Sequence, residues 1–223
     1  MTKGQDRRKR ILDVAQDSVL AKGVGATSID EIIAATGITK SGFFYHFKDK
    51  NELAKAMLLR YLAEDEKVNG NIFGRAQVLM DDQLQAFLLG HKLLSEVFSD
   101  MPNGHPGCLV ASCCITERLF DKEIQAISKQ ATLQWRHRFH GLFDQIMAKY
   151  PPHEPVEIDQ LADMVSTVIE GGIVMSKAMK EPAILVQQTL VLRTIVKMLF
   201  SPQPILEVAS APDEPERTAN NVR

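Results

Sequence analysis

The segment TKSGFFYHFKDK combines polar and aromatic side chains that are suited to contact a polyanion. Lys40 and Ser41 supply hydrogen-bond donors, and Gly42 permits a close approach because it has no side chain. Phosphate oxygens require donors, whereas base edges require close approach, so this segment meets both needs of a reader of duplex DNA. Phe43 and Phe47 lie four residues apart, and we expect them to anchor one face of a helix inward.

Three helix-start patterns surround this segment. Ser28 and Glu31 form an S-x-x-E capping box, in which each side chain accepts a backbone N–H from the other residue. Thr39 is placed to cap the next helix, and Asp49 with Glu52 repeats the capping pattern once more. The sequence therefore predicts three successive helices, of which the first two are short.

A very tight turn joins the two short helices. Thr36-Gly37 ends the first, and the second begins almost at once. A helix predicted from about Asp6 to Gly23 precedes them. Two short helices across a tight turn, with supporting helices on either side, can hold a recognition helix in a major groove. The pattern predicts a helix-turn-helix.

Charge is distributed unevenly along the chain. Residues 1–60 contain 11 Lys and Arg and 7 Asp and Glu, which is a net charge of +4. Because the whole chain has a net charge of −2, the remaining residues carry a net charge of −6. This polarity fits a module that faces phosphates beneath an acidic body. Solvated charged faces on both halves would give the same numbers, so charge alone does not decide the function.

The string TSIDEIIAATGITKSGFFYHFKDKNELAKAML closely resembles the DNA-binding domain of the TetR family, and the resemblance is strong over residues 6–64. It is weaker later, where GCLVASCCITE and IEGGIVMSKA are similar to the family's effector-domain helices. The resemblance implies a ligand-responsive repressor that binds a pseudo-palindromic DNA operator as a homodimer. A small molecule of unknown identity would be its effector.

Carried over residue by residue, the resemblance also implies the DNA contacts. Residues expected at the second and third helices are Thr27, Ser28, Thr39, Lys40, Ser41 and Gly42, and those expected along the phosphate backbone are Phe44, Tyr45, His46 and Lys50. Many family members have tyrosine where this chain has Phe44, which lacks the hydroxyl. Lys50 is also supported by its place in the first turn of a helix, where free N–H groups attract a phosphate. Packing of the helix end is the simpler alternative for Tyr45 and His46.

The rest of the chain also reads as helical, so the fold class is all-α. We expect a helix-turn-helix DNA-binding domain at 1–66, a helical ligand-binding and dimerisation domain at 67–201, and a disordered tail at 202–223 that is rich in Pro, Ala and charge. Helices predicted near 156–180 and 183–200 should pair with a second copy as a four-helix bundle. Their apolar runs include Val165, Val168, Ile169, Leu192, Ile195, Val196 and Leu199.

The effector pocket is predicted among the middle helices. Its candidate lining residues are Phe87, His91, Leu94, Cys108, Ser112, Trp135, Phe139 and Met175. They mix apolar bulk with a few polar tips, as ligand cavities do, although a plain core stripe has the same pattern.

Cys108 is a special case, because it begins a predicted helix at 108–120 just after the turn PNGHPG. A helix N-terminus lowers a thiol pKa, which would favour a reactive thiolate that senses electrophiles or oxidants. A small buried hydrophobe at a helix start is the alternative. Cys113 and Cys114 are expected to be buried packing residues.

Enzyme chemistry is not indicated. The sequence contains no GxGxxG, GxxxxGK, GxSxG or HExxH motif, and we expect no cofactor and no metal. His137 and His140 are three apart on one helix, but surface or core histidines explain them better. No uninterrupted apolar stretch approaches about 18 residues, so we expect a cytoplasmic protein without a membrane span. The rival function is a helical protein-interaction module without DNA binding.

Overall fold

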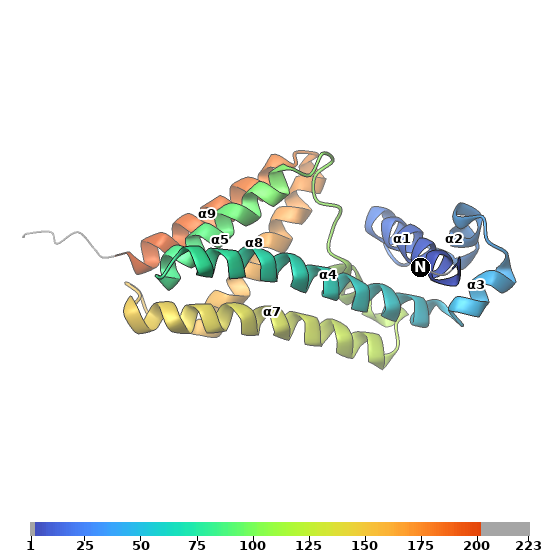
Figure 1. Ribbon diagram of the computed structural model, residues 1–223, viewed down its shortest axis with the longest axis horizontal. Helices are drawn as coiled ribbons and strands as arrows, with labels where there is room; N and C mark the ends of the chain where they lie inside the picture. The colour runs from blue at the N-terminus through green and yellow to red at the C-terminus, as the bar shows by residue number, and fades with distance from the viewer. Residues whose placement is uncertain (1–2, 202–223) are drawn as a thin grey trace, which may run out of the picture.

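The computed structural model describes residues 3–201, and every regular element in that range is helical, which confirms the all-α fold class (Figure 1). The elements in chain order are α1 (Lys3–Lys22), α2 (Ile29–Thr36), α3 (Lys40–His46), α4 (Lys50–Leu79), α5 (Gln83–Ser99), α6 (Leu109–Ile115), the 3-10 turn η1 (Glu117–Leu119), α7 (Lys122–Lys149), α8 (Ile158–Met179) and α9 (Ala183–Phe200).

Helices α1, α2 and α3 gather at one end of the molecule, as Figure 1 shows. Gly37 ends α2 in the left-handed conformation at φ 67°, which a residue without a Cβ adopts at little cost. Thr39 then caps α3, and its Oγ1 accepts the N–H of Gly42 at 3.1 Å. The helix-turn-helix predicted from the capping pattern is therefore confirmed.

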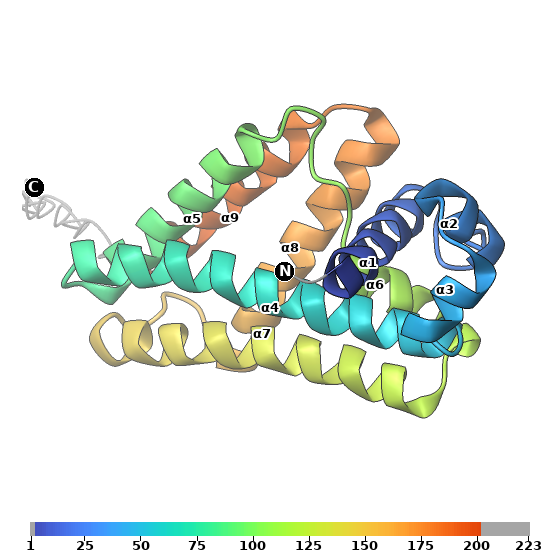
Figure 2. The ribbon, with the colours of Figure 1, turned by 45° about the vertical axis from the view of Figure 1, so that its right-hand side comes forward.

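Helix α4 connects this end to the rest of the molecule without a break. It is capped by Asp49, whose Oδ1 accepts the N–H of Glu52 at 2.9 Å, and continues for 30 residues through Gly70 and Gly74. The boundary expected between residues 66 and 67 falls inside this helix, so the division into two domains stays a prediction. Helix α7 lies alongside α4 in both ribbon views (Figures 1 and 2).

The remaining helices form the body. Helix α5 packs on α9 and on α4, and α8 packs on both α7 and α9, so that α4, α5 and α8 form three sides of a triangle in Figure 2. Buried side chains fall into two clusters: one joins α1–α4 to α6 and the start of α7, and the other fills the body. The N-terminal helices thus share a core with α6.

Two helix boundaries differ from expectation. The first helix begins at Lys3, ahead of the predicted start at Asp6. The helix predicted over 108–120 is divided into α6 and η1, and Cys108 is the N-cap of α6 and not part of it. The tail predicted to be disordered, 202–223, lies outside the described residues.

Helix α9 is, within residues 3–201, the one helix long and apolar enough to cross a membrane by length and composition. The core helix of a soluble protein passes the same test, although only 28% of this window is buried within the chain. The sequence contained no uninterrupted apolar run of this length because Gln187, Gln188, Arg193 and Lys197 interrupt it.

Candidate DNA interface and effector cavity

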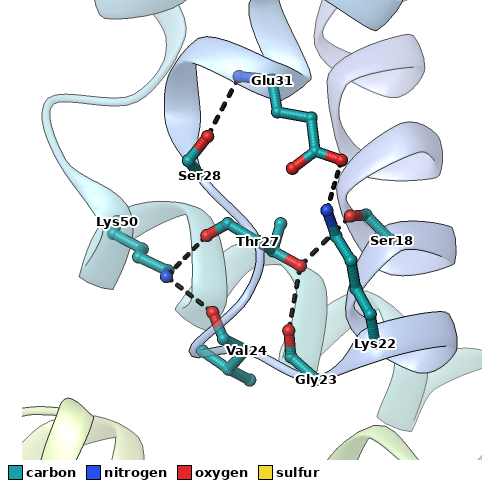
Figure 3. Close-up of polar contacts among 8 residues, drawn as sticks. All are labelled: Ser18, Lys22, Gly23, Val24, Thr27, Ser28, Glu31 and Lys50. Atoms are coloured by element: carbon teal, nitrogen blue, oxygen red, sulfur yellow. Dashed lines mark hydrogen bonds and ion pairs between the residues drawn. The ribbon is translucent and has the colours of Figure 1, made fainter.

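The start of α2 is held by the predicted capping box, which Figure 3 shows in part. Ser28 has extended backbone angles, and its Oγ accepts the N–H of Glu31 at 3.2 Å. In return, hydrogen bonds from the Lys22 ammonium and from the backbone N–H of Ser28 lower the pKa of the Glu31 carboxyl. Lys22 belongs to α1, so the same contact ties α1 to α2.

Thr27 is buried, although it was predicted to contact DNA. Its Oγ1 donates to the carbonyl of Gly23 at 3.0 Å and lies 3.1 Å from the Oγ of Ser18 (Figure 3). Its side chain therefore holds the loop between α1 and α2. A DNA contact by Thr27 stays a prediction that would require this hydroxyl to be released.

Lys50 braces the same loop from the first turn of α4. Its Nζ donates to the carbonyl oxygens of Val24 and Thr27, each at 2.7 Å (Figure 3). Burial lowers the pKa of Lys50. An ammonium has three protons, so one donor remains for the phosphate contact that was predicted. Sequence reasoning identified the residue but missed the brace, because its acceptors are 26 and 23 residues away in the chain.

Helix α3 separates its two faces sharply. Phe43 and Phe47 are buried as predicted, and their ring centroids lie 6.0 Å apart. Arg8 of α1 lies 5.0 Å above the Phe47 ring, a cation–π contact that places α1 against the end of α3. The opposite face is open: Tyr45 is 84% exposed, and Phe44 is 43% exposed.

The polar residues at the start of α3 are also available. Lys40 and Ser41 are exposed, and the only ion pair that Lys40 forms within residues 3–201 is a 3.8 Å contact with the exposed Asp30. Such a surface pair is worth little in water and can exchange for a phosphate. His46 is half-buried at the helix end, where its ring lies 5.0 Å from that of Tyr45. The structure thus brings together on one surface most residues expected to contact DNA.

A cavity of about 310 Å³ is lined mainly by α4, α5, α7 and α8, with Gln16 of α1 and with Met101 and His105 of the loop after α5. Of the eight residues predicted to line a pocket, Leu94, Trp135 and Phe139 do so. Phe87 and His91 are buried beside it, with the His91 ring 6.0 Å from that of Phe139.

The other three predicted pocket residues lie elsewhere. Ser112 is half-buried and donates to the carbonyl of Cys108 at 2.9 Å. Met175 is 52% exposed on α8 and lies outside the set of residues that line the cavity. Cys108 is buried next to the lining residues Tyr61 and Glu170, with which its thiol hydrogen-bonds.

The lowered thiol pKa predicted for Cys108 is wrong. Burial and the charge of Glu170 raise the pKa of the thiol, and these effects outweigh the one backbone N–H, from Ala111, that reaches the sulfur. Cys113 is buried as predicted, but Cys114 is exposed. Helix position alone did not predict the thiol chemistry, because the acid that faces Cys108 comes from α8.

Sequence reasoning missed the charged residues of the cavity. Asp65, Arg138 and Glu170 line it together with His105. One signal was present in the sequence: Glu170 is the only charged residue between Asp163 and Lys177, within an otherwise apolar and small stretch. An acid in such a stretch either faces water at the surface or faces a site.

The pair of histidines considered as metal ligands lies on the surface. His140 Nδ1 is 2.8 Å from Asp159 Oδ1, and both side chains are about half exposed. His137 is exposed. The surface interpretation therefore accounts for both residues.

Helices α8 and α9 present an apolar surface outward. Its exposed residues are Val174, Met175, Met179, Val191, Ile195 and Met198. Of the residues predicted for the interface, Val165, Leu192 and Val196 lie inside the chain's own core, whereas Ile195 is 45% exposed. Both helices predicted for the interface carry exposed apolar residues, and their pairing with a second copy stays a prediction. The composition of a helix does not show which of its faces remains open.

Comparisons with known proteins agree with this architecture. The family model described as bacterial regulatory proteins, tetR family, matches residues 11–57. The regulator AcrR of Shigella flexneri is 45% identical over 49 residues, which are 22% of this chain and 23% of AcrR. The uncharacterised regulator YxaF of Bacillus subtilis is 25% identical over 186 residues, which are 81% of this chain and 90% of YxaF. The chain thus matches less than a quarter of AcrR but most of YxaF.

Solved structures extend the similarity to the body. A TetR-family regulator from Chloroflexus aurantiacus aligns with 90% of this chain and 98% of its own, at a TM-score of 0.73 and 20% identity. One from Agrobacterium tumefaciens aligns with 89% of this chain and 100% of its own, at 0.73 and 15% identity. At such identities the similarity shows a common fold.

Proposed function

Because the chain belongs to the TetR family of bacterial regulatory proteins, we propose that it is a transcriptional repressor that binds a pseudo-palindromic operator as a homodimer. A small molecule bound in the body would release it from DNA. It acts as a regulator and not as an enzyme, and its place of action is the cytoplasm, where the DNA is. In this proposal residues 1–66 form the domain that binds DNA, and residues 67–201 form the domain that binds the effector and dimerises.

One observation carries the proposal: α3 buries Phe43 and Phe47 and leaves Lys40, Ser41 and Tyr45 open on the other side. Such a helix can enter a major groove while its anchors stay in the core. Thr39 to Gly42 would then face base edges, and a Cβ at Gly42 would lie 3.1 Å from Thr39 Oγ1, so little room exists there for a side chain. Tyr45, His46 and Lys50 would face the phosphates, with Thr27 and Ser28 at the start of α2 and Phe44 beside them.

Dimerisation follows from the apolar surface on α8 and α9. Two copies that pair these helices form a four-helix bundle, which covers the exposed side of α9 without a membrane. A symmetric dimer presents two copies of α3, and half-sites one helical turn apart, about 34 Å or a multiple of it, would match them.

The test is a mobility shift with genomic fragments over a range of salt concentrations. A DNA reader loses affinity steeply as salt rises, because phosphate contacts release counterions. Tyr45→Ala should weaken binding to all sequences, whereas Lys40→Ala should change which sequence is preferred. Lys122→Ala, an exposed residue at the start of α7, is the matched control and should do neither.

A helical protein-interaction module would give a different result. It would show no salt-dependent shift with any genomic fragment, and neither α3 variant would differ from the control. That outcome would overturn the proposed function.

A further inference from the structure

The cavity in the body has an aromatic wall. Phe98, Trp135 and Phe139 line it from α5 and α7, and its volume of about 310 Å³ lies at the lower end of the range for small-molecule sites. Aromatic faces carry negative electrostatic potential and attract organic cations as well as apolar groups. The wall therefore accepts a ligand with an apolar body.

Two carboxylates face this wall without a cation of their own. Asp65 accepts the indole N–H of Trp135 at 2.9 Å and the side-chain amide of Asn69 at 3.0 Å, and both donors are neutral. Glu170 accepts a hydrogen bond from the thiol of Cys108. Across residues 3–201, neither carboxylate forms an ion pair with Lys, Arg or His within 4.0 Å.

Both acids lie in surroundings that disfavour their charged forms. Burial raises the pKa of both carboxyls, and the negative charge of Asp65 raises that of Glu170 further. A buried carboxylate whose partners are neutral is costly, and a cation placed beside it removes much of that cost. The lining of the cavity thus favours a positively charged group beside these two acids.

The positive groups at the cavity do not satisfy this preference. Arg138 lies close enough to Asp65 to lower its pKa, but its guanidinium forms an ion pair with Glu66. Burial, followed by the charge of Lys177, lowers the pKa of His105 to about 4, so this imidazole is neutral at pH 7. Glu64 adds a third acid to the lining.

We propose that the effector of this protein is a lipophilic organic monocation, whose positive charge lies between Asp65 and Glu170 and whose apolar body packs on Trp135, Phe98 and Phe139. The proposal rests on the proposed function, because it names the ligand class of the proposed effector site. The cation replaces the thiol of Cys108 as the partner of Glu170, and the aromatic faces contribute cation–π contacts.

The sequence provides a reporter for this test, because Trp135 is the only tryptophan in the chain and lines the cavity. Full-length protein without DNA is titrated with tetraphenylphosphonium and with tetraphenylborate, an anion of the same shape, while tryptophan fluorescence is recorded. A smaller pair, benzyltrimethylammonium and the uncharged neopentylbenzene, covers ligands of lower volume. In at least one pair the cation should bind about tenfold or more tightly than its partner.

Two variants identify the charges responsible. Glu170→Gln and Asp65→Asn keep the size of each side chain and remove its charge, so each should weaken binding of the preferred cation by about tenfold. Glu96→Gln is the matched control, since this exposed acid of α5 pairs with Lys92 away from the cavity, and it should leave the affinity unchanged. Far-UV circular dichroism establishes that each variant is folded.

Two results would overturn the inference. In the first, neither cation binds more tightly than its shape-matched partner. In the second, a cation binds but Glu170→Gln and Asp65→Asn bind it as tightly as the control. Because the titration contains no DNA, its outcome is independent of operator binding: a protein that binds cations but shows no mobility shift retains the ligand class and loses the proposed function.

Discussion

The N-terminal helices and the body place their functional side chains in opposite ways. In α2 and α3, hydroxyls at Ser28 and Thr39 cap the helices, and residues within a few positions of these caps form the open surface. In the body, the side chains around the cavity come from several helices far apart in the chain, and Asp65 and Trp135 meet although they are 70 residues apart. The first surface depends on local geometry, and the second depends on packing between distant segments.

The largest expected effect is that a substitution in the body abolishes DNA binding by the N-terminal helices. Ile195→Glu would place a charge on the apolar surface of α9, and a symmetric interface would bury two such charges without partners. We expect the dimer to weaken by at least about 100-fold and operator binding to be lost with it, although α3 is unchanged. Analytical ultracentrifugation and a mobility shift measure the two effects.

Val78→Glu is the control for this prediction. Val78 is 85% exposed on α4 and is not part of the apolar surface of α8 and α9. If Ile195→Glu and Val78→Glu both remained dimeric at micromolar concentration, the proposed interface on α8 and α9 would have to be abandoned.

The next effect concerns the buried histidine of the body. Burial lowers the pKa of His91 from 6.5 to about 4, so the folded protein resists protonation that the unfolded chain accepts. Stability from the neutral ring is present above pH 6.5 and is lost as pH falls toward 4, by about 3 kcal/mol in the free energy of unfolding. His91→Phe should reduce this acid-induced loss in urea denaturation measured from pH 7 to pH 4.

His105, whose pKa is also lowered to about 4, would still contribute its share in that variant. His137→Gln, at an exposed position on α7, should retain the acid dependence of the unmodified protein. Equal slopes against pH for all three proteins would show that His91 is not protected from protonation as proposed.

A smaller effect on the free energy of unfolding is expected at two glycines within helices. Tertiary packing should decide its sign at one, and helix propensity should decide its sign at the other. A Cβ at Gly90 would lie 2.5 Å from a ring carbon of Phe73, and that ring is enclosed by His91 and Phe139. Gly90→Ala should lower the free energy of unfolding by about 1–3 kcal/mol because the ring has little room to move.

Gly141 in α7 has nothing within 4 Å of its added Cβ. Gly141→Ala should therefore raise the free energy of unfolding by about 0.5–1 kcal/mol through helix propensity alone. Urea denaturation of the two variants gives the comparison directly. A gain in stability for both variants would mean that packing at Gly90 does not dominate.

The smallest effect is local to the N-terminal helices. Ser28→Ala removes the side-chain cap of α2 and should cost about 1 kcal/mol of unfolding free energy. Ser99→Ala is the matched change at an exposed position in the last turn of α5, where no helix N-terminus is capped, and it should alter stability by less than about 0.5 kcal/mol. If urea denaturation gave the same free energy of unfolding for Ser28→Ala and Ser99→Ala, the capping box would not define the start of α2.

Short-range signals in the sequence were sufficient for much of the fold. The capping residues Ser28, Thr39 and Asp49, together with Gly37 at the end of α2, predicted the helix-turn-helix because each acts on backbone groups within four residues. Apolar runs likewise predicted α8 and α9 close to their observed bounds.

Only the tertiary structure decided what the buried polar residues do. The reactivity of Cys108 depends on Glu170 of α8, and the brace from Lys50 depends on carbonyls of the loop before α2. A thiol pKa or a hydrogen bond is set by burial and by the groups that face it, and for these residues those groups are far away in the chain. The sequence by itself determined which helices form and which surface α3 presents, whereas packing determined which side chains enclose the cavity.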